Sequence, residues 1–232
     1  METQVQGPAT VSFWYRVLSG SGYGDHLRFY VDGEQRFVDG GDIPWSNVQR
    51  TLGPGLHTLR WSYAKDANSS AGFDAAWVDQ VQVSSTYSDW AAHYFTPAQL
   101  NNPLVGGFSA DPDGDGLNNG LEATFGLNPM NTLPSQMPES TLDGIAPDQR
   151  LVMEFWMAEL PPADLTYKVE VSNNLTTWMT IAQKSGSGPW SGAALVTEAS
   201  PSDGRLLVRA YDVQPISASS QQRYMRFAVT KP

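Results

Sequence analysis

Apolar and polar residues alternate over most of the chain, which is the pattern of β-strands with one buried face. In the first part of the sequence, the alternation predicts strands at 9–18, 27–31, 35–38, 56–64 and 77–83. Asp32-Gly33, between the second and third of these, is a strong hairpin signal. Strands resume late in the chain, with predicted positions 151–158, 167–172, 178–182, 206–211 and 224–229. The pattern predicts an all-β fold made of two sandwiches.

The middle of the chain reads differently, as short helices and turns. Thr96-Pro97 is typical of a helix N-cap followed by proline at the first helical position. Residues 118–125 predict a second short helix, and Gly126 suits the left-handed residue that ends it. We expect no incoming helix of the EF-hand kind before this one.

These elements define three expected domains. Residues 1–85 form a jelly-roll-like sandwich, 86–147 an acidic calcium-binding segment with a linker at 134–147, and 148–232 an immunoglobulin-like or fibronectin type III-like sandwich. The fold class is therefore all-β, with the two sandwiches joined by a short helical segment.

Residues 111–122 match the calcium-loop pattern D-x-[DN]-x-[DN]-G-x5-E at every constrained position. Calcium takes six to eight oxygen ligands at flexible angles, and alternate carboxylates on a tight loop can supply them. Gly116 permits the sharp bend, because a side chain there would resist a positive φ. The predicted ligands are Asp111, Asp113, Asp115, the backbone carbonyl of Leu117, Asn119 and Glu122.

The charge distribution supports a cation at this loop. The segment from Asp66 to Gln149 contains 11 acidic residues and no lysine or arginine. The rest of the chain has 13 acids and 14 bases, so the net charge of −10 comes from the segment that contains the loop. A bound Ca²⁺ would offset part of this charge.

Composition excludes several classes of function. The chain has no cysteine, which rules out disulfides and thiolate metal sites. No apolar run reaches membrane-spanning length, and the acidic balance argues against nucleic acid. The first residues lack the basic and apolar stretches of a signal peptide.

Two resemblances extend this interpretation. The stretch 95–129, with its single loop, resembles the dockerin-like or thrombospondin type 3-like calcium loops found near the C-termini of large secreted proteins of Verrucomicrobia-like bacteria. The single loop departs from dockerins, which carry two. Residues 167–178 resemble the C-terminal domain that often follows this segment, a family without a well-defined activity.

The first strands carry another resemblance. The stretches 7–15, 27–33, 55–61 and 72–79 look like the MAM-like or cleaved-adhesin sandwiches appended to secreted bacterial proteases and hydrolases. Such domains usually begin with further strands. The resemblance therefore implies that the chain is the C-terminal part of a longer secreted or cell-surface protein. We expect an open strand edge near the N-terminus, or a homodimer that covers it.

Two functional hypotheses follow. The first is a non-catalytic accessory, adhesion or carbohydrate-binding tail, in which Ca²⁺ rigidifies the segment between two sandwiches and Trp45 or Tyr23 stacks on a polysaccharide or cell-surface glycan. The alternative is a calcium-dependent hydrolase acting on an ester, lactone or glycoside, with His93 and Asp89 beside the ion.

Other candidate groups have ordinary structural explanations. His57 has the strand parity of apolar neighbours, which favours a core or edge position over a catalytic one. Asp66, Asp74 and Asp79 could form a second calcium site, but loop and strand-end acids are the simpler interpretation.

Overall fold

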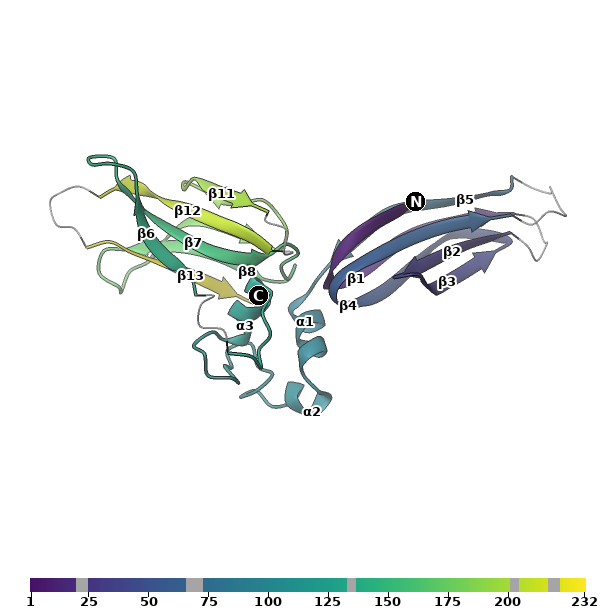
Figure 1. The fold of residues 1–232 in the computed structure, drawn as a ribbon, viewed down its shortest axis with the longest axis horizontal. Helices are drawn as coiled ribbons and strands as arrows, with labels where there is room; N and C mark the ends of the chain where they lie inside the picture. The colour runs from purple at the N-terminus through teal and green to yellow at the C-terminus, as the bar shows by residue number, and fades with distance from the viewer. Residues whose placement is uncertain (20–24, 66–72, 133–136, 201–204, 217–221) are drawn as a thin grey trace. The chain divides into compact units, whose positions relative to one another are not determined.

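The computed structural model describes residues 1–19, 25–65, 73–132, 137–200, 205–216 and 222–232. The chain divides into two compact units, Met1–Ser85 (unit 1) and Thr86–Pro232 (unit 2). Strands dominate both units and form three antiparallel sheets, which confirms the predicted all-β fold (Figure 1). None of the described helices is long and apolar enough to cross a membrane.

Unit 1 is built from five strands in the order β3-β2-β4-β1-β5. Every strand predicted from the alternation is present. The sequence missed the first half of β4, because Pro44 and the run 53–55 of glycine and proline are poor strand formers. The strands are β1 (Glu2–Leu18), β2 (His26–Val31), β3 (Glu34–Gly40), β4 (Asp42–Ala64) and β5 (Ala75–Ser84).

One bent sheet supplies both layers of unit 1. The β1–β4 ladder shifts register between Gly7 and Ala9. The two strands approach so closely here that a Cβ on Gly7 would lie 1.9 Å from the Gly53 carbonyl oxygen. Beyond this point the Phe13 ring lies 5.0 Å from Phe29 and 5.4 Å from Trp61, measured between centroids. These residues come from different parts of the sheet, so its two halves pack face to face. The long, curved β1 and β4 are visible in Figure 1.

The N-terminal stretch of β1 has a strand on one side only. Glu2–Gly7 pairs with β4, whereas the ladder between β1 and β5 begins at Thr10. Among the described strands, none covers the second side of Glu2–Gly7. This is the open edge expected from the sequence, while a homodimer through it stays a prediction.

Unit 2 contains two four-stranded sheets with the orders β10-β9-β8-β13 and β11-β12-β7-β6. The rings of Phe155 on β7 and Phe227 on β13 lie 4.5 Å apart and join the two layers. The strands are β6 (Glu139–Asp143), β7 (Arg150–Ala158), β8 (Thr166–Ser172), β9 (Met179–Ser185), β10 (Ser191–Gly192), β11 (Val196–Ala199), β12 (Arg205–Pro215) and β13 (Tyr224–Thr230). The sequence missed β6, which lies inside the predicted linker.

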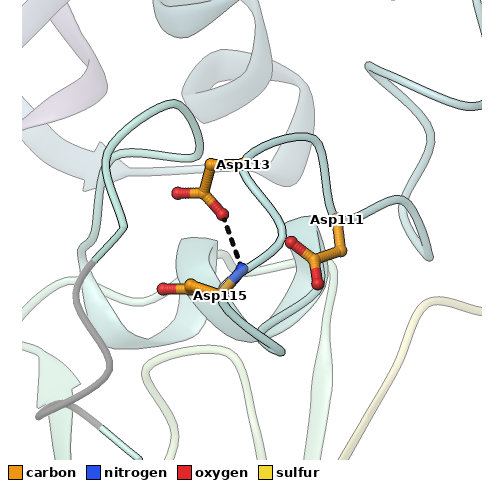
Figure 2. A group of neighbouring side chains, drawn as sticks. All are labelled: Asp111, Asp113 and Asp115. Carbon is orange, nitrogen blue, oxygen red and sulfur yellow. Dashed lines mark hydrogen bonds between the residues drawn. The ribbon is translucent and has the colours of Figure 1, made fainter.

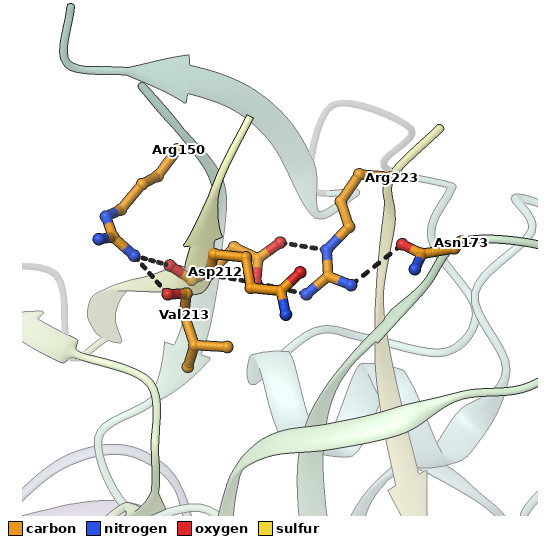
Figure 3. A network of polar contacts seen from close by, with 6 residues as sticks. Arg150, Asn173, Asp212, Val213 and Arg223 are labelled. Atoms are coloured by element: carbon orange, nitrogen blue, oxygen red, sulfur yellow. Dashed lines mark hydrogen bonds and ion pairs between the residues drawn. The ribbon is translucent and has the colours of Figure 1, made fainter. Parts of the chain in front are cut away.

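A buried ion pair connects the two sheets of unit 2 at one end. Asp212 on β12 is 1% exposed and accepts two hydrogen bonds from the Arg223 guanidinium, at 2.5 and 2.7 Å (Figure 3). Arg223 precedes β13 and also donates to the Asn173 side chain, which follows β8. Arg150 on β7 donates to the backbone carbonyls of Asp212 and Val213. The Arg223 guanidinium thus neutralises the Asp212 carboxylate, which would be costly to bury as an unpaired charge.

Among the described residues of unit 2, three short helices precede the strands: α1 (Tyr87–Tyr94), α2 (Pro97–Leu100) and α3 (Asn119–Phe125). The predicted N-cap Thr96 of α2 is confirmed, and Gly126 ends α3 at a φ of +70° as predicted. Asn118, predicted as the first helical residue, is the N-cap of α3. The sequence did not predict α1, although Thr86 and Asp89 form a capping box there.

The predicted calcium-binding segment shares one hydrophobic core with the following sandwich. Trp90 on α1 and Phe125 on α3 are buried in the same cluster as the strand residues of both sheets. The Phe125 ring lies 5.6 Å from Phe227, and the Trp90 indole donates to the Leu127 carbonyl at 3.2 Å. Residues 86–147 therefore fold as part of unit 2, not as a domain of their own.

Candidate metal centre

The loop that carries the acidic motif is closed by backbone hydrogen bonds at its two ends. Asn119 N–H donates to the Ala110 carbonyl at 2.8 Å, and Gly120 N–H donates to the Phe108 carbonyl at 2.9 Å. A Cβ on Gly120 would lie 2.5 Å from the Phe108 ring, so a larger residue here would displace that ring. The closure fixes the start of α3 against the beginning of the loop.

Inside the loop, backbone N–H groups orient the carboxylates. Gly114 and Gly116 have φ values of +75° and +95°, a region that favours glycine. The two oxygens of Asp111 accept hydrogen bonds from these residues, at 2.8 Å from Gly114 and 3.0 Å from Gly116. The bend predicted at Gly116 is confirmed.

Three carboxylates converge on this loop. Asp111, Asp113 and Asp115 each offer an oxygen, and these three oxygens lie within 4.8 Å of one another (Figure 2). Asp113 accepts the Asp115 N–H at 3.2 Å, and Asp115 accepts the Leu117 N–H at 2.8 Å. Like charges at this separation repel, and a cation placed among them would convert the repulsion into attraction.

Glu122 adds a fourth carboxylate from α3. Its side chain is 1% exposed, and neither oxygen has a hydrogen-bond partner among the described residues. Burial, followed by the negative charges of Asp113, Asp115 and Asp111, raises the pKa of Glu122 to about 8. Burial and the neighbouring carboxylates also raise the pKa of Asp113, whose buried Oδ2 has no hydrogen-bond partner within the described ranges. Buried charges are normally paired or bound to a metal, so these oxygens are available as ligands.

The other two predicted ligands have structural roles. The Asn119 side chain is fully buried, and its Nδ2 donates to the carbonyls of Val105 and Gly107, both at 2.7 Å. The Leu117 side chain is 1% exposed and belongs to the core of unit 2. Ligation by the Leu117 carbonyl and by Asn119 stays a prediction.

The groups suggested for catalysis lie in ordinary positions. Asp89 accepts hydrogen bonds from the backbone and hydroxyl of Thr86, at 2.9 and 2.7 Å, and so caps α1. His93 is exposed on the last turn of α1 and packs edge-on to Tyr94.

Of the three residues suggested for a second calcium site, the structure describes Asp74 and Asp79, and these two belong to no metal-ligating cluster among the described residues. Asp74 forms an ion pair with Lys65, and Asp66 lies outside the described residues. Asp79 lines a separate pocket on unit 1.

His57 is a partly buried, hydrogen-bonded histidine on β4, consistent with the structural role that its parity suggested. Its Nδ1 lies 2.7 Å from Asp32 Oδ2 and its Nε2 lies 2.9 Å from the Gly53 carbonyl oxygen. Burial opposes charge on the imidazole, but the hydrogen bonds to Asp32 and Gly53 outweigh it and raise the pKa of His57.

Of the aromatic residues suggested for sugar stacking, Trp45 is 44% exposed, and Tyr23 lies outside the described residues. The sequence analysis overlooked Trp14, which is 40% exposed beside Trp45 in one pocket. The signal was present in the strand pattern. Trp14 has the opposite parity to the buried Phe13 and Tyr15, which places a large aromatic side chain on the outer face.

Comparison with known proteins adds no relative. No protein-family model matches the chain, and no curated protein matches it in sequence. The dockerin-like, adhesin-like and immunoglobulin-like resemblances therefore stay predictions. The candidate site rests on its own geometry: three carboxylates with oxygens within 4.8 Å of one another on a closed loop, and the buried Glu122 on the helix that follows it.

Proposed function

We propose that the chain is a calcium-binding, non-catalytic part of a secreted or cell-surface protein, in which the ion holds the loop 111–122 against the core of unit 2. The observation that supports this most directly is Glu122. Both of its oxygens are buried and have no hydrogen-bond partner in the part of the chain that the structure describes, while three further carboxylates lie in the same loop. A divalent cation would satisfy all four groups at once.

The donor set favours calcium over other metals. It consists of carboxylate oxygens, which suit hard cations, and the chain has no cysteine for softer ones. Magnesium demands a near-ideal octahedron and keeps several waters, whereas Ca²⁺ accepts more ligands in a flexible geometry. A bidentate Glu122 with the three aspartates fits the second description.

A structural role for the ion follows from where Glu122 lies. The residues that follow it on α3, Ala123, Thr124 and Phe125, are all buried. Binding at Glu122 therefore stabilises the helix that packs against the sheets, and a ligand of the folded state adds to its stability. This is the behaviour expected of an accessory, adhesion or carbohydrate-binding tail.

The alternative, a calcium-dependent hydrolase of esters, lactones or glycosides, has less support. Asp89 already serves as a helix cap. A hydrolase of this kind would also require the calcium ion to generate a nucleophile from bound water, the role best known for Zn²⁺.

Calorimetric titration of chelator-stripped protein with CaCl₂ tests the proposal. We expect saturable binding at micromolar to millimolar calcium, weaker binding of magnesium, and loss of binding in Asp113→Asn. Asp148→Asn is the matched control, since it removes an exposed acid of the same unit outside the loop. Absence of binding at millimolar calcium would overturn the proposal.

A panel of ester and lactone substrates, assayed with and without chelator, separates the two functions. We expect no turnover in either condition. Hydrolysis that disappears in Glu122→Ala and in chelator would favour the enzyme.

A further inference from the structure

The outer face of unit 1 carries a pocket that the calcium site does not explain. It has a volume of about 360 Å³ and is lined by Trp14, Trp45, Asp79 and Gln80. Trp14 and Trp45 are 40% and 44% exposed, which is unusual for two large aromatic residues in one place. The pocket thus combines two accessible indoles with one carboxylate and one amide.

Two irregularities of the sheet build this pocket around Trp14. The β1–β5 ladder passes from Ser12 opposite Gln82 to Trp14 opposite Asp79, so that Gln80 and Val81 both oppose Phe13. Such a bulge re-aims side chains and is common beside functional sites.

On the other side of β1, the ladder with β4 passes from Tyr15 opposite Ser46 to Val17 opposite Ile43. Pro44 and Trp45 therefore both oppose Arg16, in a second bulge. The two bulges flank the same central strand and bring β4 and β5 residues to the rim of one pocket.

Backbone geometry at Gln80 supports a built site. Its φ is +49°, a conformation that residues other than glycine rarely adopt and that tends to occur at functional positions. The Gln80 N–H donates to Asp79 Oδ1 at 2.7 Å, which holds the carboxylate at the pocket.

We infer that this pocket binds a neutral pyranose oligosaccharide. Aromatic faces pack on the C–H faces of sugar rings, while the Asp79 carboxylate accepts hydrogen bonds from hydroxyls and the Gln80 amide both donates and accepts. A purely apolar ligand would remove water from the Asp79 carboxylate without offering it a hydrogen bond, and an anionic ligand would be repelled by it.

A peptide fits less well than a sugar. Extended peptides bind along open sheet edges, but Trp14 lies on β1 between β4 and β5, where the backbone already pairs on both sides. The inference deepens the carbohydrate-binding part of the proposed function and does not depend on the calcium part, which the calcium titration tests separately.

The test is calorimetric titration of the full chain with cellohexaose, laminarihexaose and xylohexaose, with indole fluorescence as a second readout. We expect at least one of them to bind with a dissociation constant below about 1 mM. Trp14→Ala and Trp45→Ala should each weaken binding by about tenfold or more, and Trp14→Phe should restore part of it.

Trp178→Ala is the matched control, because Trp178 belongs to unit 2 and stacks on Arg226 there. It should leave sugar binding unchanged. Circular dichroism and the melting temperature establish that each variant folds.

Three outcomes would overturn the inference. One is the absence of binding by every hexasaccharide at about 10 mM. Another is binding that survives both tryptophan substitutions, which would place the sugar elsewhere. The third is a dimer in sedimentation analysis that Trp14→Ala dissociates while no sugar binds, which would assign this face to self-association.

Discussion

Replacing Glu122 with glutamine tests the electrostatic reasoning, because the change in stability should have opposite signs with and without calcium. Without a cation, the buried carboxylate destabilises the folded state, because its pKa rises from 4.5 to about 8. At about pH 7.5 this shift corresponds to about 4 kcal/mol of lost folding free energy. Glutamine removes the charge but leaves a buried amide without partners, which costs about 1–3 kcal/mol.

The net effect is therefore a gain. In chelator, Glu122→Gln should be more stable than the wild type by about 1–3 kcal/mol and should melt several degrees higher. In calcium the order should reverse. At a free concentration of about a thousand times the dissociation constant, the ion adds about 4 kcal/mol to the wild type, and the variant lacks the bidentate ligand.

Differential scanning calorimetry of both proteins, in chelator and in saturating calcium, measures the four melting temperatures. Glu159→Gln is the matched control, since it removes an exposed charge from the same unit and should change neither condition. A Glu122→Gln protein that melts below the wild type in chelator would refute the buried-charge argument. Equal stabilisation of both proteins by calcium would refute ligation by Glu122.

Three further predictions concern packing, ion pairing and pH. Phe125→Ala should cost about 3–5 kcal/mol in urea unfolding, since this ring is fully buried between the sheets, and a loss below about 1 kcal/mol would contradict its place in the core. Arg223→Met should lower the free energy of unfolding by a similar amount, because it leaves the buried Asp212 without its counter-ion. Arg209→Met, which breaks an exposed ion pair with Glu154, should lower it by less than about 1 kcal/mol, and equal losses would speak against the buried pair. The raised pKa of His57 contributes stability that is fully present below its ordinary pKa of 6.5 and is lost as pH rises through the pKa of the folded state. The free energy of unfolding of His57→Gln should therefore lack this pH dependence. An NMR titration showing a lowered pKa for His57 would contradict the prediction.

The alternation of apolar and polar residues predicted most strands of this fold, because each strand of these sheets turns one face toward the core and the other toward solvent. The hairpin at Asp32-Gly33 is an example: both residues have positive φ, at +54° and +81°, as the dipeptide indicates. The first half of β4 could not be predicted in this way. Pro44 and Gly53 weaken a strand locally, and only pairing with β1 over its whole length makes this segment extended.

The candidate site shows the same limit. Spacing alone indicated the three aspartates and Glu122, because a calcium loop constrains residue types at fixed positions. It could not show that Glu122 is buried without partners among the described residues, since burial arises from the packing of α3 on strands more than twenty residues later in the chain. Nor could it show that the Asn119 amide is engaged by the carbonyls of Val105 and Gly107.

The proposed calcium site and the core of unit 2 are linked through α3. A helix of 7 residues is too short to be stable alone, so tertiary contacts must hold it. Phe125 supplies these contacts from the buried side of α3. Glu122, on the same helix, places a carboxylate near the negative charges of the three loop aspartates. Removing the ion therefore acts directly on a core helix, whereas the indoles of the unit 1 pocket are positioned by strand pairing alone. Chelator should lower the stability of unit 2 and leave saccharide binding intact, and a joint loss of both would show that the two sites are coupled.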